Sequence, residues 1–384
     1  MSEFDRRQFI KATAGLGAAG LGGIAGCTGG PSGGDDEDTT ESTTESGDET
    51  GTETESTTSS ESDVTNVGMV YATGGLGDGS FNDQAQQGLF AAADEYNIEY
   101  EETQPDSATQ FSNYQQQLAG STNPDYDLVS CIGFLQKDSL SETSTQYPDQ
   151  DFQIVDEVVD EPNVASYTFR EHEGSFLVGV LASTLTTQSF SAGAGATQSD
   201  STNLGFVGGV EGGLIKKFEA GFKAGVKYAN DDVDVSTSYI GSFNDPSGGK
   251  EAALQMYSSG ADIIYHASGN TGTGVFQAAQ QEGKFAVGVD RDQSVTKSSY
   301  ADVILASMAK RVDTAVYNAI EAKVNGEYPG GEHTTLGLQE EGVSCVYGQQ
   351  LGSEIPSDVK TAVEDARTGI IEGDISVPTD PSNV

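Results

Sequence analysis

Basic residues are scarce in this chain of 384 residues, which has 18 Lys and Arg against 60 Asp and Glu and a formal net charge of -42. A polyanion of this kind repels nucleic acid and anionic lipid, so the composition argues against a nucleic-acid partner. Acidic residues occur throughout the chain. We interpret this surplus as a halophilic surface, adapted to high salt, in which screening removes the self-repulsion.

Cysteine and histidine are also few, with three of each, and tryptophan is absent. Neither a Cys-x-x-Cys nor a His-Glu-x-x-His spacing occurs, so we expect no metal site. Cys131 and Cys345 each lie in a strand-like apolar run, and both a disulfide and two buried free thiols are compatible with the sequence. No Ser/His/Asp or Cys/His order stands out, so we expect neither an enzyme nor a cofactor.

The N-terminus has the pattern of an export signal. Arg6 and Arg7 precede a stretch of small and apolar residues, which ends in Ile-Ala-Gly before Cys27. Paired arginines indicate the twin-arginine route, and the final four residues resemble a lipoprotein box. We therefore predict a signal over residues 1–27, a lipid anchor on Cys27 and a place on the extracytoplasmic face of the plasma membrane. The alternative is an apolar helix with a chance cysteine.

Residues 28–63 are rich in Ser, Thr, Asp and Glu and contain no aromatic residue. Such a segment cannot bury enough apolar surface to offset chain entropy, so the composition predicts disorder. It would serve as a tether that lifts a domain off the membrane, or as a solubilising tail.

The remaining 320 or so residues alternate between strand-like apolar runs and helical patterns. Helices are expected to begin at Asn82, Glu171, Ile215 and Lys310, among others. The alternation predicts parallel sheets covered by helices on both faces. This length suits two doubly wound lobes, with a break near residues 169–173.

The segments that follow the predicted strands share an unusual composition. Ligands bind at the carboxyl ends of parallel strands in such folds. Nearly every segment at such an end combines glycine with an aromatic residue or a carboxylate; the segments are 73–82, 133–134, 169–171, 241–245, 266–274 and 290–293. Glycine lets backbone approach a ligand, aromatic faces stack on flat rings, and carboxylates accept bonds from hydroxyls.

The motifs "GDGSFND", "LGFVGGVEGGLIKKFEAGFKAGVKY", "VGVDRDQ" and "ASMAKRVDTAVYNAI" resemble the basic membrane protein family, in that order along the chain. The resemblance runs from about Asn66 to Lys323. Members of this family are lipid-anchored substrate-binding proteins of ABC transporters, similar to bacterial purine nucleoside receptors. The resemblance implies a protein that binds a nucleoside, with a purine favoured as its base, and delivers it to a permease and ATPase. We expect the protein to be a monomer.

The same resemblance implies an α/β chain with the type I periplasmic-binding-protein fold. Two doubly wound lobes with parallel sheets would be joined by a hinge of several crossings and would close around the ligand. The first lobe is expected to comprise residues 64–169 and about 303–332. The second is expected to comprise residues 170–302 and about 333–384.

Site residues follow from the matching motifs. The loop from Asp78 to Asn82 should meet the base, Asp290 should take the ribose hydroxyls, and Lys310 should support that end. Phe81, with Phe134 or Phe169, should wall the base. The complete set of predicted ligand-binding residues is Asp78, Ser80, Phe81, Asn82, Phe134, Phe169, Phe243, Gly269, Gly272, Asp290, Asp292 and Lys310.

Structural roles compete with these assignments. Asp78 could cap a turn or the helix after Ser80, because aspartate is a favoured capping residue. Phe134 and Phe243 could pack in the core. Lys310 could instead neutralise Asp313 or Asp290 as a structural ion pair.

Two other classes of function compete with transport. Gly75-x-Gly77 after a strand, with Glu101 or Glu102 further on, faintly resembles a dinucleotide-binding motif, but Ser80 occupies the place of its third glycine. An exported protein would also be separated from the cytoplasmic cofactor pool. A membrane-anchored sensor for a small polar ligand would have the same pocket as a transporter's receptor.

Overall fold

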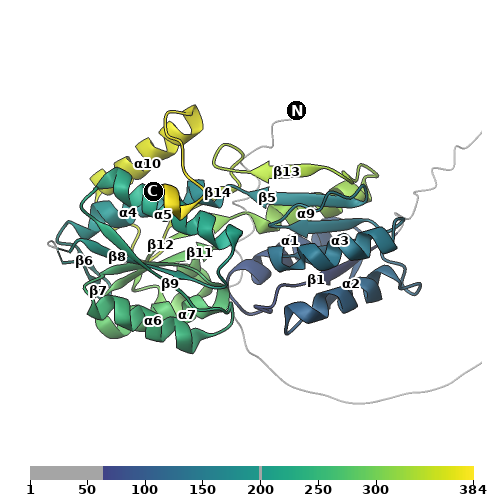
Figure 1. The fold of residues 1–384 in the computed structure, drawn as a ribbon, viewed down its shortest axis with the longest axis horizontal. Helices are drawn as coiled ribbons and strands as arrows, with labels where there is room; N and C mark the ends of the chain where they lie inside the picture. The colour runs from purple at the N-terminus through teal and green to yellow at the C-terminus, as the bar shows by residue number, and fades with distance from the viewer. Residues whose placement is uncertain (1–63, 199–200) are drawn as a thin grey trace, which may run out of the picture. The chain divides into compact units, whose positions relative to one another are not determined.

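The computed structural model describes residues 64–198 and 201–384. The predicted signal, Cys27 and the predicted tether lie outside the described residues. Within the described part, the chain forms two lobes, each built on a six-stranded sheet (Figure 1).

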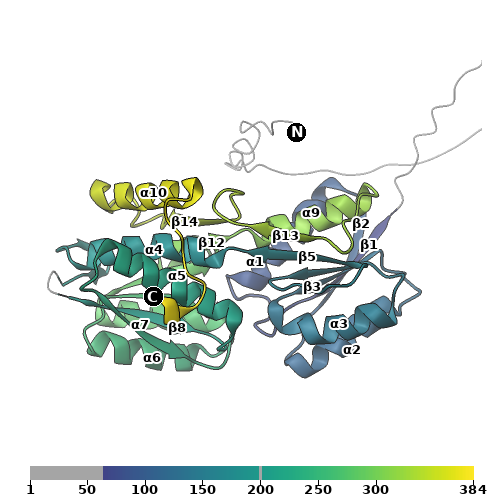
Figure 2. The same ribbon diagram turned by 45° about the horizontal axis from the view of Figure 1, so that its top comes forward.

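The first sheet has the strand order β13-β5-β4-β3-β1-β2, and every neighbouring pair is parallel. Helices α1 and α9 cover one face and α2 and α3 the other (Figures 1 and 2). The strands are β1 (Thr65–Val70), β2 (Ile98–Thr103), β3 (Leu128–Ile132), β4 (Phe152–Val155), β5 (Val164–Phe169) and β13 (His333–Leu336), and the helices are α1 (Phe81–Glu95), α2 (Phe111–Ala119), α3 (Lys137–Gln146) and α9 (Val312–Val324).

The second sheet has the order β14-β12-β11-β10-β8-β9, with β14 antiparallel to β12 and the other pairs parallel. Helices α4 and α5 pack on one face and α6 and α7 on the other, while α10 packs on α4 (Figure 2). The strands are β8 (Asn203–Gly208), β9 (Asp234–Tyr239), β10 (Ile263–Ala267), β11 (Phe285–Asp290), β12 (Ile304–Lys310) and β14 (Val343–Tyr347), and the helices are α4 (Glu171–Thr186), α5 (Gly213–Ala229), α6 (Pro246–Ser258), α7 (Gly272–Glu282), α8 (Gln293–Thr296) and α10 (Ser357–Glu372); a small hairpin joins β6 (Ser191–Ala192) and β7 (Gly195–Ala196).

The alternation of strands and helices follows the sequence closely, because the central strands are continuously apolar and buried. All six residues of β11 and all seven of β12 are buried, as expected for strands covered on both faces. The predicted helix starts at Asn82, Glu171 and Ile215 lie within two residues of the observed starts.

The lobe boundaries after residue 302 differ from the expectation. Residues 304–310 form β12 of the second sheet, not part of the first lobe, because this wholly buried strand completes the second core beside β11. Residues 333–336 form β13 of the first sheet, where they pair with β5. The chain crosses between the lobes after β5, after β12 and between β13 and β14. The helix expected from Lys310 therefore begins at Val312, beyond the second crossing.

Cys131 and Cys345 are free thiols. Cys131 lies in β3 of the first sheet and Cys345 in β14 of the second, so the structure decides the alternative that the sequence left open in favour of unpaired cysteines. No helix among the described residues is long and apolar enough to cross a membrane. The described residues also contain no group of three or more His, Cys, Asp or Glu side chains arranged to hold a metal ion.

Candidate functional site

A cavity lies between the two lobes, at the carboxyl ends of the strands. This position is the one at which open α/β sheets bind ligands. The first lobe supplies the segments after β1, β3 and β4 and the start of α2. The second lobe supplies the start of α5, the segments after β9 and β10, and the ends of β11 and β12.

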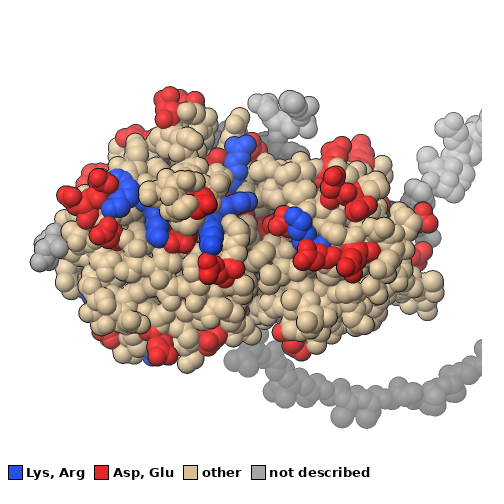
Figure 3. All heavy atoms as spheres, in the orientation of Figure 1, with Lys and Arg blue, Asp and Glu red and all other residues tan. Residues whose placement is uncertain are grey.

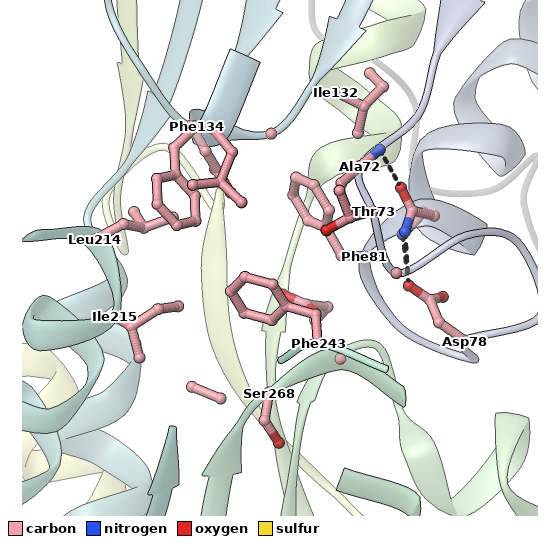
Figure 4. A pocket seen from close by; sticks show the side chains of 18 of the residues that line it. Ala72, Thr73, Asp78, Phe81, Ile132, Phe134, Leu214, Ile215, Phe243 and Ser268 are labelled. Atoms are coloured by element: carbon pink, nitrogen blue, oxygen red, sulfur yellow. Dashed lines mark hydrogen bonds between the residues drawn. The ribbon is translucent and has the colours of Figure 1, made fainter. Parts of the chain in front are cut away.

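One part of the cavity is aromatic and aliphatic. Phe81 and Phe134 from the first lobe face Phe243, Leu214 and Ile215 from the second (Figure 4). Phe134 and Phe243 meet edge to face, with 6.2 Å between their ring centroids. A flat, apolar ring system would find contacts from both lobes here.

The other part carries charge. Lys310 is almost wholly buried, and its Nζ lies 2.7 Å from Oδ2 of Asp156 and 3.9 Å from Oε1 of Glu171. The Phe81 ring centroid is 4.8 Å from the same Nζ. Burial alone would lower the pKa of Lys310, but Asp156, Asp290 and Glu171 more than offset that effect and raise it, so the ammonium stays charged.

Asp156 and Asp290 share a backbone conformation that is rare for residues other than glycine. Asp156 has φ 73° and Asp290 has φ 64°, and each lies at the end of a strand. Aspartate tolerates this left-handed conformation better than most residues. The conformation recurs at functional sites, and here both side chains line the cavity beside Lys310.

The two carboxylates differ in their partners. Oδ2 of Asp290 accepts a hydrogen bond of 2.5 Å from the hydroxyl of Ser80, which belongs to the other lobe. Burial raises the pKa of Asp290, against the opposing effects of Lys310 and Ser80. Oδ1 of Asp156 is buried and has no hydrogen-bond partner. A buried carboxylate oxygen without a partner is costly, so Oδ1 is well suited to accept a bond from a ligand donor.

The carboxylate of Asp78 holds its own loop together. Oδ1 accepts from the backbone N–H of Ser80 at 2.8 Å, and Oδ2 accepts from the N–H of Asn82 at 3.0 Å and from its side-chain amide at 3.2 Å. Oδ1 of Asn82 accepts from the N–H of Ala72 (Figure 4). Burial raises the pKa of Asp78 to about 6. The capping role that competed with ligand contact is therefore present, although both side chains also line the cavity.

Eight of the twelve predicted site residues line the cavity: Asp78, Phe81, Asn82, Phe134, Phe243, Gly269, Asp290 and Lys310. Their contact with a ligand stays a prediction. Gly269 has φ 57°, a conformation that favours glycine at this close approach. Lys310 pairs with Asp156, whereas Asp313, one of the two partners considered for it, pairs with Arg311.

The other four predicted residues are not part of the cavity lining. Ser80 acts through its bond to Asp290, and Phe169 is buried with its ring 5.4 Å from the Nζ of Lys310. Gly272 is needed for packing, because a Cβ there would lie 2.0 Å from Cε1 of His266. Asp292 caps α8 by accepting from the N–H of Ser294.

Asp156 and the apolar residues Phe111, Leu214, Ile215 and Phe218 also line the cavity, although they were not among the residues predicted from the sequence. A signal for Asp156 was present, since it follows the strand "FQIV" directly, as Asp290 ends the strand "FAVGVD". The apolar residues carried no such signal, because core residues and pocket residues of this type look alike in a sequence.

Two α/β lobes with three crossings and a cavity between them define a solute-binding protein with the type I periplasmic-binding-protein fold. Residues 65–380 match the family model described as ABC transporter substrate-binding protein PnrA-like. The chain belongs to this family, as the resemblance of its motifs indicated.

Individual proteins are similar to this chain over most of its length. The chain is 38% identical over 338 residues to a CD4+ T-cell-stimulating antigen of Listeria innocua, covering 84% of this chain and 90% of that protein. It is 34% identical to the ABC transporter nucleoside-binding protein BmpA of Lactococcus lactis, over 81% of this chain and 88% of that one. A solved solute-binding protein of an ABC transporter system from Aeropyrum pernix superposes with a TM-score of 0.73 at 28% identity, covering 83% and 95%.

Family membership and a second match, to an export signal, support three conclusions. The protein is the substrate-binding component of an ABC transport system, which binds a small ligand and interacts with the permease and ATPase. Such proteins are not enzymes, so the dinucleotide-dependent alternative is set aside. Residues 3–23 match the twin-arginine signal model, which indicates export.

Proposed function

We propose that the cavity binds a nucleoside, with a purine as the favoured base. The observation that supports this most directly is the separation of the cavity into an aromatic part and a part with Asp156, Asp290 and Lys310. A nucleoside has the same two halves, a flat base and a ribose with vicinal hydroxyls. The Lactococcus relative is named as a nucleoside-binding protein.

In the proposed pose, the base lies among Phe81, Phe134 and Phe243. The ribose hydroxyls donate to Asp290 and to the unpartnered oxygen of Asp156. Lys310, already bonded to Asp156, donates to a ribose oxygen. This arrangement uses the carboxylates as acceptors and leaves the aromatic faces to the base.

The charges of the cavity disfavour a phosphorylated ligand. Within the described part of the chain, the cavity lining holds three carboxylates and one cation, Lys310. That cation is shared between Asp156 and the nearby Glu171 and Asp290. A phosphate would add negative charge without a free cation to receive it, so we expect nucleosides to bind and nucleotides to be rejected.

Calorimetry on wild type and Asp290→Ala, each with guanosine and with guanine, tests the proposal. Charged hydrogen bonds contribute about 1.5–3 kcal/mol each, so the substitution should weaken guanosine binding by roughly ten- to several-hundredfold. Guanine has no ribose and should bind both proteins alike. Equal guanosine affinity in the two proteins would contradict the ribose assignment. Native mass spectrometry of protein purified in high salt tests the ligand class independently, and a co-purified dinucleotide would overturn it.

We also propose that the mature protein is a monomer fixed to the extracytoplasmic face of the plasma membrane through a lipid on Cys27. The match to the export signal and the Ile-Ala-Gly-Cys sequence support the anchor. In the native host, Cys27→Ala should move the protein from the membrane fraction to the medium. Retention of the variant in the membrane would contradict the anchor, and the mass of the detergent-extracted protein checks the monomer.

The acid surplus is proposed as an adaptation to high salt. On the face shown in Figure 3, acidic side chains lie on both lobes. Melting temperature should therefore rise with added KCl and level off beyond about 1 M, where the screening length is only about 3 Å. A melting temperature that does not change with salt would contradict this interpretation.

A further inference from the structure

The carbonyl of Gly79 is one of the groups through which the two lobes contact each other. Its oxygen accepts a hydrogen bond of 2.7 Å from the hydroxyl of Thr296 and a longer one of 3.4 Å from Nε2 of Gln293. Gly79 belongs to the first lobe, whereas both donors come from α8 of the second. Gly79 also lies between Asp78, which lines the cavity, and Ser80, which bonds to Asp290.

The orientation of Gln293 is fixed from within the second lobe. Its Oε1 lies 2.8 Å from the backbone N of Val289 and 2.9 Å from Nε2 of His266. A backbone N–H can only donate, so this atom must be the amide oxygen, and the amide nitrogen is left to face Gly79. His266 is wholly buried, and its ring is held against Gly272. The donor that reaches the first lobe is therefore set in place before the lobes meet.

The first-lobe side of this contact is equally well defined. Gly79 has φ 63°, a backbone conformation that favours glycine. The N–H of Gly79 donates to Asp83 at 2.8 Å, and Asp78 accepts from the N–H groups of Ser80 and Asn82. A displacement of the Gly79 peptide would therefore move Asp78 and Ser80 with it.

We propose that Thr296 and Gln293 are positioning residues, which fasten the Gly79 peptide when the lobes close and thereby set how fast the ligand leaves. Both bonds must break when the lobes separate about the crossings, because their ends belong to different lobes. They contribute to the closed form alone, so their loss should act on ligand release more than on ligand entry.

Thr296→Val tests this inference, because valine keeps the shape of the side chain and removes the donor. A neutral hydrogen bond contributes about 0.5–1.5 kcal/mol, so stopped-flow displacement of guanosine should show release about two- to tenfold faster. The association rate should stay within about twofold. Thr296→Ser retains the hydroxyl and should restore slow release.

Thr184→Val is the matched control. Thr184 is also half-buried, and its hydroxyl donates to the carbonyl of Val180 within α4. It should leave the release rate unchanged. Equal release from wild type and Thr296→Val would overturn the proposal.

The release measurement rests on the proposed function, so a second measurement separates the two claims. Hydrogen exchange of peptides covering residues 74–83 in the full-length protein is compared without ligand and at saturating guanosine. Guanosine should slow this exchange in wild type and Thr296→Ser more than in Thr296→Val, because the bond to Gly79 belongs to the closed form. Peptides covering residues 357–372 should exchange alike in all three. If guanosine leaves the exchange of residues 74–83 in the wild type unchanged, the nucleoside assignment fails, while equal slowing in wild type and Thr296→Val would contradict the role of Thr296.

Discussion

The two lobes are built on the same strand order, and each places an aspartate at the same point. β4 of the first sheet and β11 of the second occupy equivalent positions, and Asp156 follows one while Asp290 ends the other. Both residues have a left-handed backbone and both line the cavity. Each aspartate takes its partner from the other lobe: Asp156 is bonded to the Lys310 ammonium, which ends β12 of the second sheet, and Asp290 to the Ser80 hydroxyl of the first lobe.

The two bonds differ in where they lie relative to the crossings between the lobes. Lys310 ends β12 of the second sheet immediately before a crossing, so its bond to Asp156 lies close to the hinge. The bond from Ser80 to Asp290 joins the loop after β1 to the end of β11. The two equivalent carboxylates therefore differ in position. Asp156 is bonded beside the crossing after β12, whereas Asp290 is bonded where the loop after β1 meets the end of β11.

Among the substitutions that test this comparison, removal of the Lys310 ammonium should lower the free energy of unfolding most. Lys310→Met leaves the buried carboxylates of Asp156 and Glu171 without their cation, and breaking a buried ion pair from one side costs about 3–5 kcal/mol. Guanidinium unfolding should show a loss of that size. Lys323→Met is the control, since Lys323 is bonded to Asp151 but partly exposed, and it should cost about 1 kcal/mol or less. Similar losses in both variants would mean that the buried cluster is not held by Lys310.

Substitution of each aspartate in turn separates stability from binding. Asp156→Ala should lower the free energy of unfolding by about 1–3 kcal/mol, because Lys310 loses its bonded partner. Asp290→Ala should change stability less, because it removes a bond that exists in the closed form. Both should weaken guanosine binding. Thermal unfolding without ligand measures stability, and calorimetry with guanosine measures affinity. If Asp290→Ala were less stable than Asp156→Ala, the assignment of the larger stabilising role to Asp156 would be wrong.

His266 of the second lobe should give a smaller effect that depends on pH. Burial lowers its pKa to about 3, well below the ordinary value of 6.5. The folded state therefore resists protonation, and stability that is fully present above pH 6.5 is lost as pH falls toward 3. His266→Gln should be less stable than wild type at pH 8, and the gap should narrow below pH 6.5 by up to about 1.4 kcal/mol per pH unit. Urea unfolding from pH 8 to pH 4.5 measures the gap, and a constant gap would show that His266 does not titrate in this way.

Much of the fold could be predicted from local pattern. The apolar runs gave the strands, and the segments after them contained Asp78, Phe81 and Asp290, all of which line the cavity. The errors came from the last crossings. Residues 304–310 look the same in sequence whether they complete the first sheet or the second, because a buried strand is apolar in either place.

The sequence alone determined the class of fold, the family and the export signal, since these depend on periodicity and on motifs that are contiguous in the chain. The tertiary structure decided which charges meet. Lys310 bonds to Asp156 across 154 positions, and Thr296 bonds to Gly79 across 217. Such pairings depend on how the two sheets are brought together by the crossings, and no local pattern records a contact between residues so far apart.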